Sequence, residues 1–199
     1  MNSGAYTDLQ IDLIKELANI GGGNAATSLS QLIDKPTNMS VPTIEIMEYN
    51  QVYERIMPEE ELVDAVLMKM LGDAGGLFLF VNTKKCSDKI VNMMVGEDLE
   101  ITDELRSSGV KELVNILVSS YLVAVGKTVN VNLISSVPIY TQDMFGAVLS
   151  SVYIESGQYD ENIMIIKNEF LYQGDKIESS LYFVPKPGVL EALFKTIGV

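Results

Sequence analysis

Residues 16–20 read Glu16-Leu-Ala-Asn-Ile20, and 96 positions later residues 112–116 read Glu112-Leu-Val-Asn-Ile116. The same spacing relates Ser40-Val-Pro42 to Ser136-Val-Pro138, so two separate segments keep one register. A period this long exceeds the roughly 20–50 residues of a solenoid unit. We therefore predict two copies of one α+β unit, related by a pseudo-two-fold axis within a single domain.

The first copy is predicted over residues 8–96 and the second over residues 105–198 of the domain 1–199. Each begins with a long helix, because apolar residues recur at helical spacing. In the first helix the predicted buried stripe is Leu9, Leu13, Leu17 and Ile20. Predicted helices cover residues 8–33, 87–95, 103–127 and 187–197; predicted strands cover residues 43–49, 63–71, 77–81, 129–140, 145–154, 163–172 and 180–184.

Short connections between the predicted strands favour antiparallel pairing over parallel crossovers. The predicted fold class is therefore α+β, with a mostly antiparallel sheet and two long helices. Three glycines, Gly21-Gly22-Gly23, interrupt the first of these helices. They predict a kink or a close approach between helix and sheet. A nest of backbone N–H groups that binds an anion is the alternative.

The composition excludes several classes of function. Lys and Arg number 14 against 27 Asp and Glu, a formal net charge of −13, whereas nucleic acids and anionic membranes attract cationic surfaces. The chain has no His and a single Cys86, which excludes Ser-His-Asp and Cys-His catalysis and His-ligated metals. No metal or cofactor of its own is predicted. With no recognisable signal peptide or membrane span, we predict a cytoplasmic protein.

One polar face of each long helix is a candidate site. Asp12, Glu16 and Asn19 are spaced four and three residues apart, which places them above one another on a helix. A solvated helix face explains one such set, since charged residues are usually exposed. Asn is a mediocre helix former, however, and its recurrence three residues after Glu favours a site that is used twice. The second set is Ser108, Glu112 and Asn115.

Without His or metal ligands, a Glu and an Asn can position a reactant, but they do not supply a strong base. The amide has two donors and an acceptor, so it can hold and aim a water molecule. Such a site suits a substrate that is already reactive and carries its own metal, for example an acyl phosphate. The Glu is then predicted to anchor a cation on the partner.

The spacing Asp12-x3-Glu16-x2-Asn19 followed by Pro42 resembles the doubled signature of the CheC/CheX/FliY family of chemotaxis phosphatases. The second spacing, Ser108-x3-Glu112-x2-Asn115 followed by Pro138, resembles it equally. Two intact copies favour CheC, the two-site type within that family. The stretch 19–30 also resembles the family's first-site helix, and residues 143–150 its second-half strand entry.

This resemblance implies hydrolysis of the aspartyl phosphate of the phosphorylated CheY response regulator. Asn19 and Asn115 would orient the attacking water, and Glu16 and Glu112 would pair with a lysine of CheY. The Mg²⁺ would be held by CheY, and the receptor deamidase CheD is implied as a second partner. The alternative is a non-catalytic adaptor or flagellar-switch interaction module that binds CheY or CheD. Supporting roles fall to Asp12, Ser108, Pro42 and Pro138.

Overall fold

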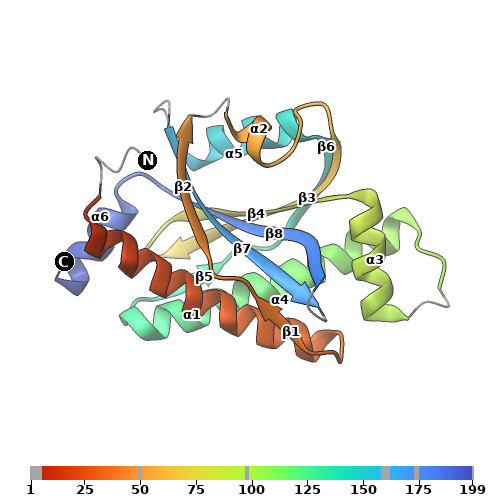
Figure 1. Cartoon of the computed structure of the whole chain (residues 1–199), viewed down its shortest axis with the longest axis horizontal. Coiled ribbons are helices and arrows are strands. Elements are labelled where there is room, and N and C mark those ends of the chain that lie inside the picture. The colour runs from red at the N-terminus through yellow and green to blue at the C-terminus, as the bar shows by residue number, and fades with distance from the viewer. Residues whose placement is uncertain (1–5, 49–50, 97–98, 158–161, 173–174, 199) are drawn as a thin grey trace.

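The structure is a computed structural model that describes residues 6–48, 51–96, 99–157, 162–172 and 175–198 (Figure 1). Its helices and strands follow one order twice. The first series is α1 (Asp8–Leu32), β1 (Thr37–Met39), β2 (Thr43–Glu48), α2 (Val52–Arg55), β3 (Leu62–Gly72), β4 (Gly76–Thr83) and α3 (Lys84–Val95). The second is α4 (Asp103–Val129), β5 (Leu133–Ser135), β6 (Ile139–Met144), α5 (Phe145–Ser156), β7 (Asn162–Tyr172), β8 (Asp175–Pro185) and α6 (Val189–Ile197).

All strands join one antiparallel sheet in which the two series exchange partners. At its centre β4 pairs with β8, and Phe78 lies opposite Phe183. On one side β3 pairs with β5 and β6 of the other series, and on the other side β7 pairs with β1 and β2. The predicted α+β class and antiparallel pairing are confirmed. The exchange means that neither series completes its own sheet.

Helices cover both faces of the sheet. The long helices α1 and α4 lie on one face, and α2 and α5 lie on the opposite face (Figure 1). Strand β3 shows why, because Val66 and Met68 enter the core with α1 and α4 whereas Val63 and Ala65 enter the core with α5. Alternate residues of a strand point to opposite faces. The two helices that carry the candidate site thus pack on the same face of the sheet.

Two predictions about secondary structure are wrong. Residues 145–154, predicted as a strand, form α5, in which Phe145, Val148, Leu149 and Val152 are buried at helical spacing against the sheet. Residues 143–150, which resemble a strand entry, are the end of β6 and the start of this helix. Their β-branched and aromatic residues favour strands locally, but packing overrides that preference. The second wrong prediction is the single strand 129–140. The structure has two short strands there, β5 and β6, which begin after α4 ends. Tyr49, the last residue of the predicted strand 43–49, lies outside the described residues.

The buried stripe of α1 also differs from the prediction. Leu9 is 62% exposed, whereas the side chains that face the core are those around Ile14, Leu17, Ala18 and Ala25. At about 100° per residue, Leu9 lies about 140° around the helix from Ile14. The small residues Ala18 and Ala25 belong to the same core as the buried residues of α4.

Gly21 marks a close approach between α1 and α4. A Cβ atom added there would lie 2.6 Å from the Tyr121 ring of α4, so the neighbour that requires glycine is the second helix and not the sheet. Helix α1 is continuous through the three glycines. Near the same contact the hydroxyl groups of Ser28 and Ser120 lie 2.7 Å apart.

Gly21→Ala is expected to lower the free energy of unfolding by about 1–3 kcal/mol, because the buried Tyr121 ring must shift. Gly23→Ala is the matched control, since a Cβ there meets nothing within 4 Å. It is expected to raise stability by about 0.5–1 kcal/mol through the lower entropy of the unfolded chain. Urea denaturation of both variants checks the pair. Equal stabilisation by the two substitutions would contradict the close approach.

Helix α4 is long and apolar enough to cross a membrane by length and composition alone, which the sequence prediction did not anticipate. Of the most apolar 18-residue stretch of this helix, 56% is buried inside the protein. The core helix of a soluble protein has the same composition, so this helix is weak evidence for a span. The cytoplasmic location stays a prediction.

Candidate functional site

The first candidate face lies on the N-terminal half of α1. Asp12, Glu16 and Asn19 are all exposed, on the side of the helix that faces away from the core. Thr7 begins the helix with a capping box: its hydroxyl accepts from the Gln10 N–H at 3.3 Å, and its own N–H donates to Gln10 Oε1 at 3.0 Å. This cap fixes the helical register in which the three side chains align.

The second candidate face lies in the matching part of α4. Ser108 and Glu112 are exposed, and Asn115 is half-buried. Thr102 caps this helix through a hydrogen bond from the Leu105 N–H at 3.2 Å. Both helices lie on the same face of the sheet (Figure 1). The structure therefore brings each predicted set together on its own helix.

No polar partner satisfies the key side chains within the described part of the protein. Glu16, Asn19, Glu112 and Asn115 make no hydrogen bond or ion pair with other described residues, and Asp12 makes only a 3.6 Å ion pair with Lys15. A buried structural Asn normally has its donors and acceptor paired inside the protein. These carboxylates and amides remain available to an external molecule; their catalytic roles stay predictions.

The Ser-Val-Pro segments connect the short strands beside each helix. The Ser40 N–H donates to the carbonyl of Glu169 at 2.9 Å, and the Ser136 N–H donates to the carbonyl of Lys69 at 2.9 Å. Pro42 is buried and Pro138 is half-buried. Neither proline offers a reactive group, and their supporting roles at the site stay predictions.

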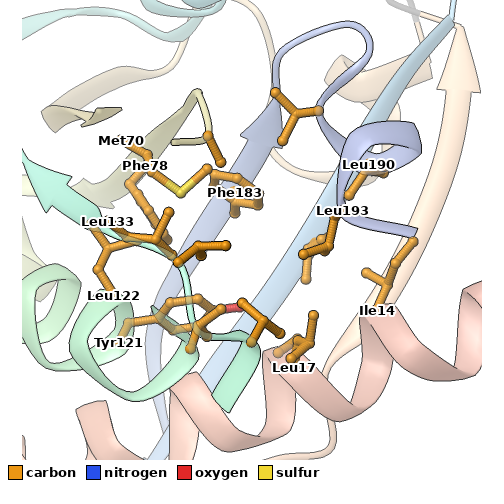
Figure 2. A pocket seen from close by; sticks show the side chains of 17 residues that line it. Ile14, Leu17, Met70, Phe78, Tyr121, Leu122, Leu133, Phe183, Leu190 and Leu193 are labelled. Carbon is orange, nitrogen blue, oxygen red and sulfur yellow. The ribbon is translucent and has the colours of Figure 1, made fainter. Parts of the chain in front are cut away.

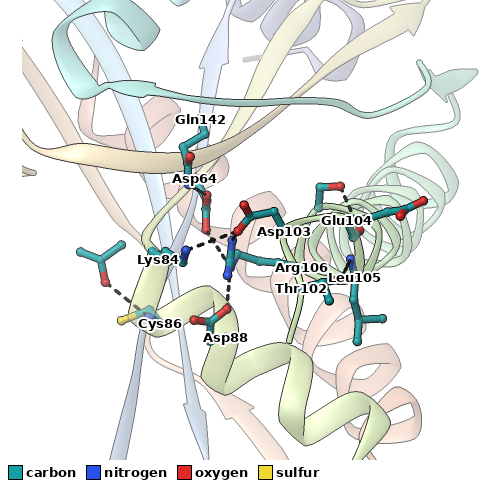
Figure 3. A network of polar contacts seen from close by, with 12 residues as sticks. Asp64, Lys84, Cys86, Asp88, Thr102, Asp103, Glu104, Leu105, Arg106 and Gln142 are labelled. Atoms are coloured by element: carbon teal, nitrogen blue, oxygen red, sulfur yellow. Dashed lines mark hydrogen bonds and ion pairs between the residues drawn. The ribbon is translucent and has the colours of Figure 1, made fainter. Parts of the chain in front are cut away.

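A buried ionic network near the start of α4 was not predicted (Figure 3). Arg106 is only 2% exposed. Its guanidinium donates to Asp88 of α3 at 2.5 Å and to Asp103 at 2.6 Å, and it lies 3.9 Å from Asp64 of β3. Asp64 in turn accepts from the Tyr140 hydroxyl at 2.6 Å. Arg106 precedes Ser108 by two residues, so this network fixes the beginning of the second face.

The pKa values in this network follow from its contacts. The hydrogen bonds from Arg106 and then Lys84 lower the pKa of Asp103. Burial alone would lower the pKa of Arg106, but the surrounding carboxylates raise it overall. Burial, together with the hydrogen bond to Asp64, raises the pKa of Tyr140. Arg106 therefore stays charged and Tyr140 neutral at physiological pH.

One sequence signal could have revealed the network. Arg106 stands in line with Val110, Leu113 and Leu117, at helical spacing on the buried side of α4. An arginine on a buried stripe requires carboxylate partners. In the first copy Gln10 occupies the corresponding position, and its side chain caps α1 instead.

An apolar pocket lies on the core side of the same helices, between α1, α4, α6 and the sheet (Figure 2). It encloses about 70 Å³ and is lined by side chains such as Ile14, Leu17 and Phe183. Burial raises the pKa of the Tyr121 hydroxyl, which points into it (Figure 2). Glu16 and Asn19 are not among the residues that line it.

No group of three or more His, Cys, Asp or Glu side chains is placed to bind a metal within the ranges that the structure describes. That the site needs no metal of its own stays a prediction. Cys86 is half-buried in the first turn of α3, and its N–H donates to the Thr83 hydroxyl at 3.4 Å.

Comparisons with known proteins agree with this picture. A sequence model of the CheC-like family matches residues 9–46, which include Asp12, Glu16, Asn19 and Pro42. The CheY-P phosphatase CheC of Bacillus subtilis (strain 168) is 28% identical over 196 residues, which are 95% of this chain and 94% of that protein.

Solved structures share the fold. The crystal structure of Thermotoga maritima FliY matches with a TM-score of 0.77 at 22% identity, over 98% of both chains. FliM in the FliM–SpeE complex from H. pylori matches with a TM-score of 0.71 at 9% identity, over 97% of this chain and 96% of that chain. At these identities the two structures support the fold alone. The sequence comparisons confirm the predicted resemblance to CheC and its family.

Proposed function

We propose that this chain, a homologue of the chemotaxis phosphatase CheC, hydrolyses the aspartyl phosphate of phosphorylated CheY. One observation carries the proposal: a Glu and an Asn stand three residues apart on an accessible helix face, twice, with no partner among the described residues. Two such faces that their own protein leaves unpaired are suited to an external polar ligand.

In the proposed reaction Asn19 or Asn115 enters the phosphorylation site of CheY and holds a water molecule in line with the phosphorus. The water oxygen forms a new bond to phosphorus while the bond from phosphorus to the aspartyl oxygen breaks. The aspartate carboxylate and inorganic phosphate leave, and the water proton passes to the phosphate or solvent. Alignment is the main requirement of phosphoryl transfer, so an amide suffices. The Mg²⁺ that neutralises charge belongs to the CheY substrate.

Glu16 and Glu112 are the proposed anchors. Each lies about one helical turn before its Asn and is exposed. A carboxylate in that place can form a charge-assisted hydrogen bond with a lysine of CheY and so orient the amide. Asp12 and Ser108 lie one further turn back and extend the same contact face.

The direct test follows the loss of phosphate from phosphorylated CheY with and without the chain. Catalytic amounts of the chain are expected to accelerate the loss in the presence of Mg²⁺. The released inorganic phosphate should equal the phosphoaspartate that is lost. An unchanged decay rate at equimolar chain would contradict the proposal.

Replacing both anchors, Glu16→Ala with Glu112→Ala, is expected to raise KM for phosphorylated CheY about tenfold or more. A hydrogen bond to a charged group is worth about 1.5–3 kcal/mol. Glu60→Ala is the matched control, since Glu60 is exposed in the loop before β3. Steady-state phosphate release measures both. An equal effect of the control would show that overall charge, and not the two anchors, governs binding.

A non-catalytic adaptor or flagellar-switch module is the second candidate, because the FliY and FliM structures have the same fold. It predicts that loss of Glu16 and Glu112 weakens association while loss of the two Asn side chains changes nothing. CheD stays a predicted second partner of either function.

A further inference from the structure

Val41 and Val137 are the two most exposed large apolar side chains among the described residues, at 77% each. They hold corresponding positions, the centre of each Ser-Val-Pro segment. Single exposed valines are common on protein surfaces. The same exposure at two positions related by the internal repeat indicates a shared requirement.

The backbone holds both valines in place. The residue before a proline is restricted to extended conformations, so Pro42 and Pro138 limit Val41 and Val137. The preceding serines are tied to the sheet by their N–H groups, and Ser136 adds two hydrogen bonds through its hydroxyl. A β-branched side chain has few rotamers. Each valine is therefore presented rigidly, which reduces the entropy lost on contact.

Ideal helix and strand spacings, starting from one observed contact in the second copy, indicate that Val137 lies level with Asn115. The Ser135 and Ser119 hydroxyl groups are 3.2 Å apart, which fixes β5 against α4. Val137 follows Ser135 by two residues, which corresponds to about 6.6 Å along an extended chain. Asn115 precedes Ser119 by four residues, which corresponds to about 6 Å along the axis of α4. From Ser119 to Asn115 this displacement has the same direction as β5. From the sequence repeat we infer the same relation between Val41 and Asn19 in the first copy.

We propose that Val41 and Val137 pack against an apolar patch beside the phosphorylated aspartate of the response regulator when the neighbouring Asn is inserted. The inference rests on the proposed function and adds a specificity contact to the same site. The Glu supplies a charged contact on one side of the Asn and the valine an apolar contact on the other. The pairing of a valine with each candidate site favours the substrate over an unrelated partner.

The test uses a double variant that combines Val41→Asp and Val137→Asp. Ile154→Asp is the control. Ile154 is 74% exposed and lies on α5, on the opposite face of the sheet (Figure 1). We expect KM for phosphorylated CheY to rise about tenfold in the valine variant, with kcat unchanged, and the control to match the wild type. Leucine at both positions is expected to restore KM.

The outcomes separate this inference from the proposed function. If the wild type accelerates phosphate loss but the valine variant keeps its KM, the inference alone is overturned. If the wild type has no activity, both fail. Light scattering is run on the same samples: a change of oligomeric state in the valine variant would show that a second copy covers the valines, which also overturns the inference.

Discussion

Asn19→Ala combined with Asn115→Ala is expected to reduce the acceleration of CheY phosphate loss about 100-fold or more. Misplacing a reactant by about 1 Å can already cost this factor, and the alanine removes the group that holds the water. KM should stay near the wild-type value, because Glu16 and Glu112 still provide the anchors. Each single variant should retain the activity of the other site.

The fold should not change in these variants. Asn19 is exposed and Asn115 half-buried, and neither amide bonds to another described residue. Asn24→Ala is the matched control on the same helix, since the exposed Asn24 amide donates only to the carbonyl of Ile20 at 2.9 Å. Phosphate release and thermal unfolding are measured on all variants. Full activity of the double variant would contradict the proposed role of the two Asn side chains, whereas the adaptor requires that the wild type itself has no activity.

Single-turnover measurements sharpen the comparison. With saturating chain and phosphorylated CheY, the first-order rate of phosphate loss reports the hydrolysis step without binding. The Asn variants should lower this rate and the Glu variants should not. The opposite pattern would exchange the proposed roles of the two residue types.

Local periodicity and repetition were sufficient to predict the helices of the site. The register Glu16-x2-Asn19 follows from helical geometry alone, so the sequence predicted which side chains share a face. That β3 and β7 each pair with strands of the other series could not be predicted, because this pairing joins residues far apart in the chain. The strand predicted for residues 145–154 was wrong for a related reason. Their local strand preference is outweighed by packing against a sheet that the sequence does not reveal.

The polar surroundings of the site were harder to predict than the site itself. Arg106 pairs with Asp64 and Asp88, which are 42 and 18 residues away in the sequence. Nothing local links these residues. The exposure of Val41 and Val137 likewise depends on what covers each segment in three dimensions. Sequence reasoning thus located the side chains that depend on one helix and missed those that depend on several elements.

Arg106→Ala is expected to lower the free energy of unfolding by about 3–5 kcal/mol, because it leaves Asp64 charged and buried without its cation. The chain offers a matched control in Arg55, which is exposed and forms a 2.8 Å ion pair with Glu45. Arg55→Ala should cost at most about 1 kcal/mol. Urea denaturation measures both, and similar losses would contradict the importance of burial.

A second substitution tests the cause of this loss. Asp64 Oδ1 accepts hydrogen bonds from Tyr140 and Gln142, whereas Oδ2 makes no hydrogen bond with the described residues. Asp64→Asn removes the charge and keeps an acceptor at the Oδ1 position. Arg106→Ala with Asp64→Asn should therefore be more stable than Arg106→Ala alone. A double-mutant cycle measures this coupling, and strictly additive losses would show that the destabilisation comes from lost packing and not from the unpaired carboxylate.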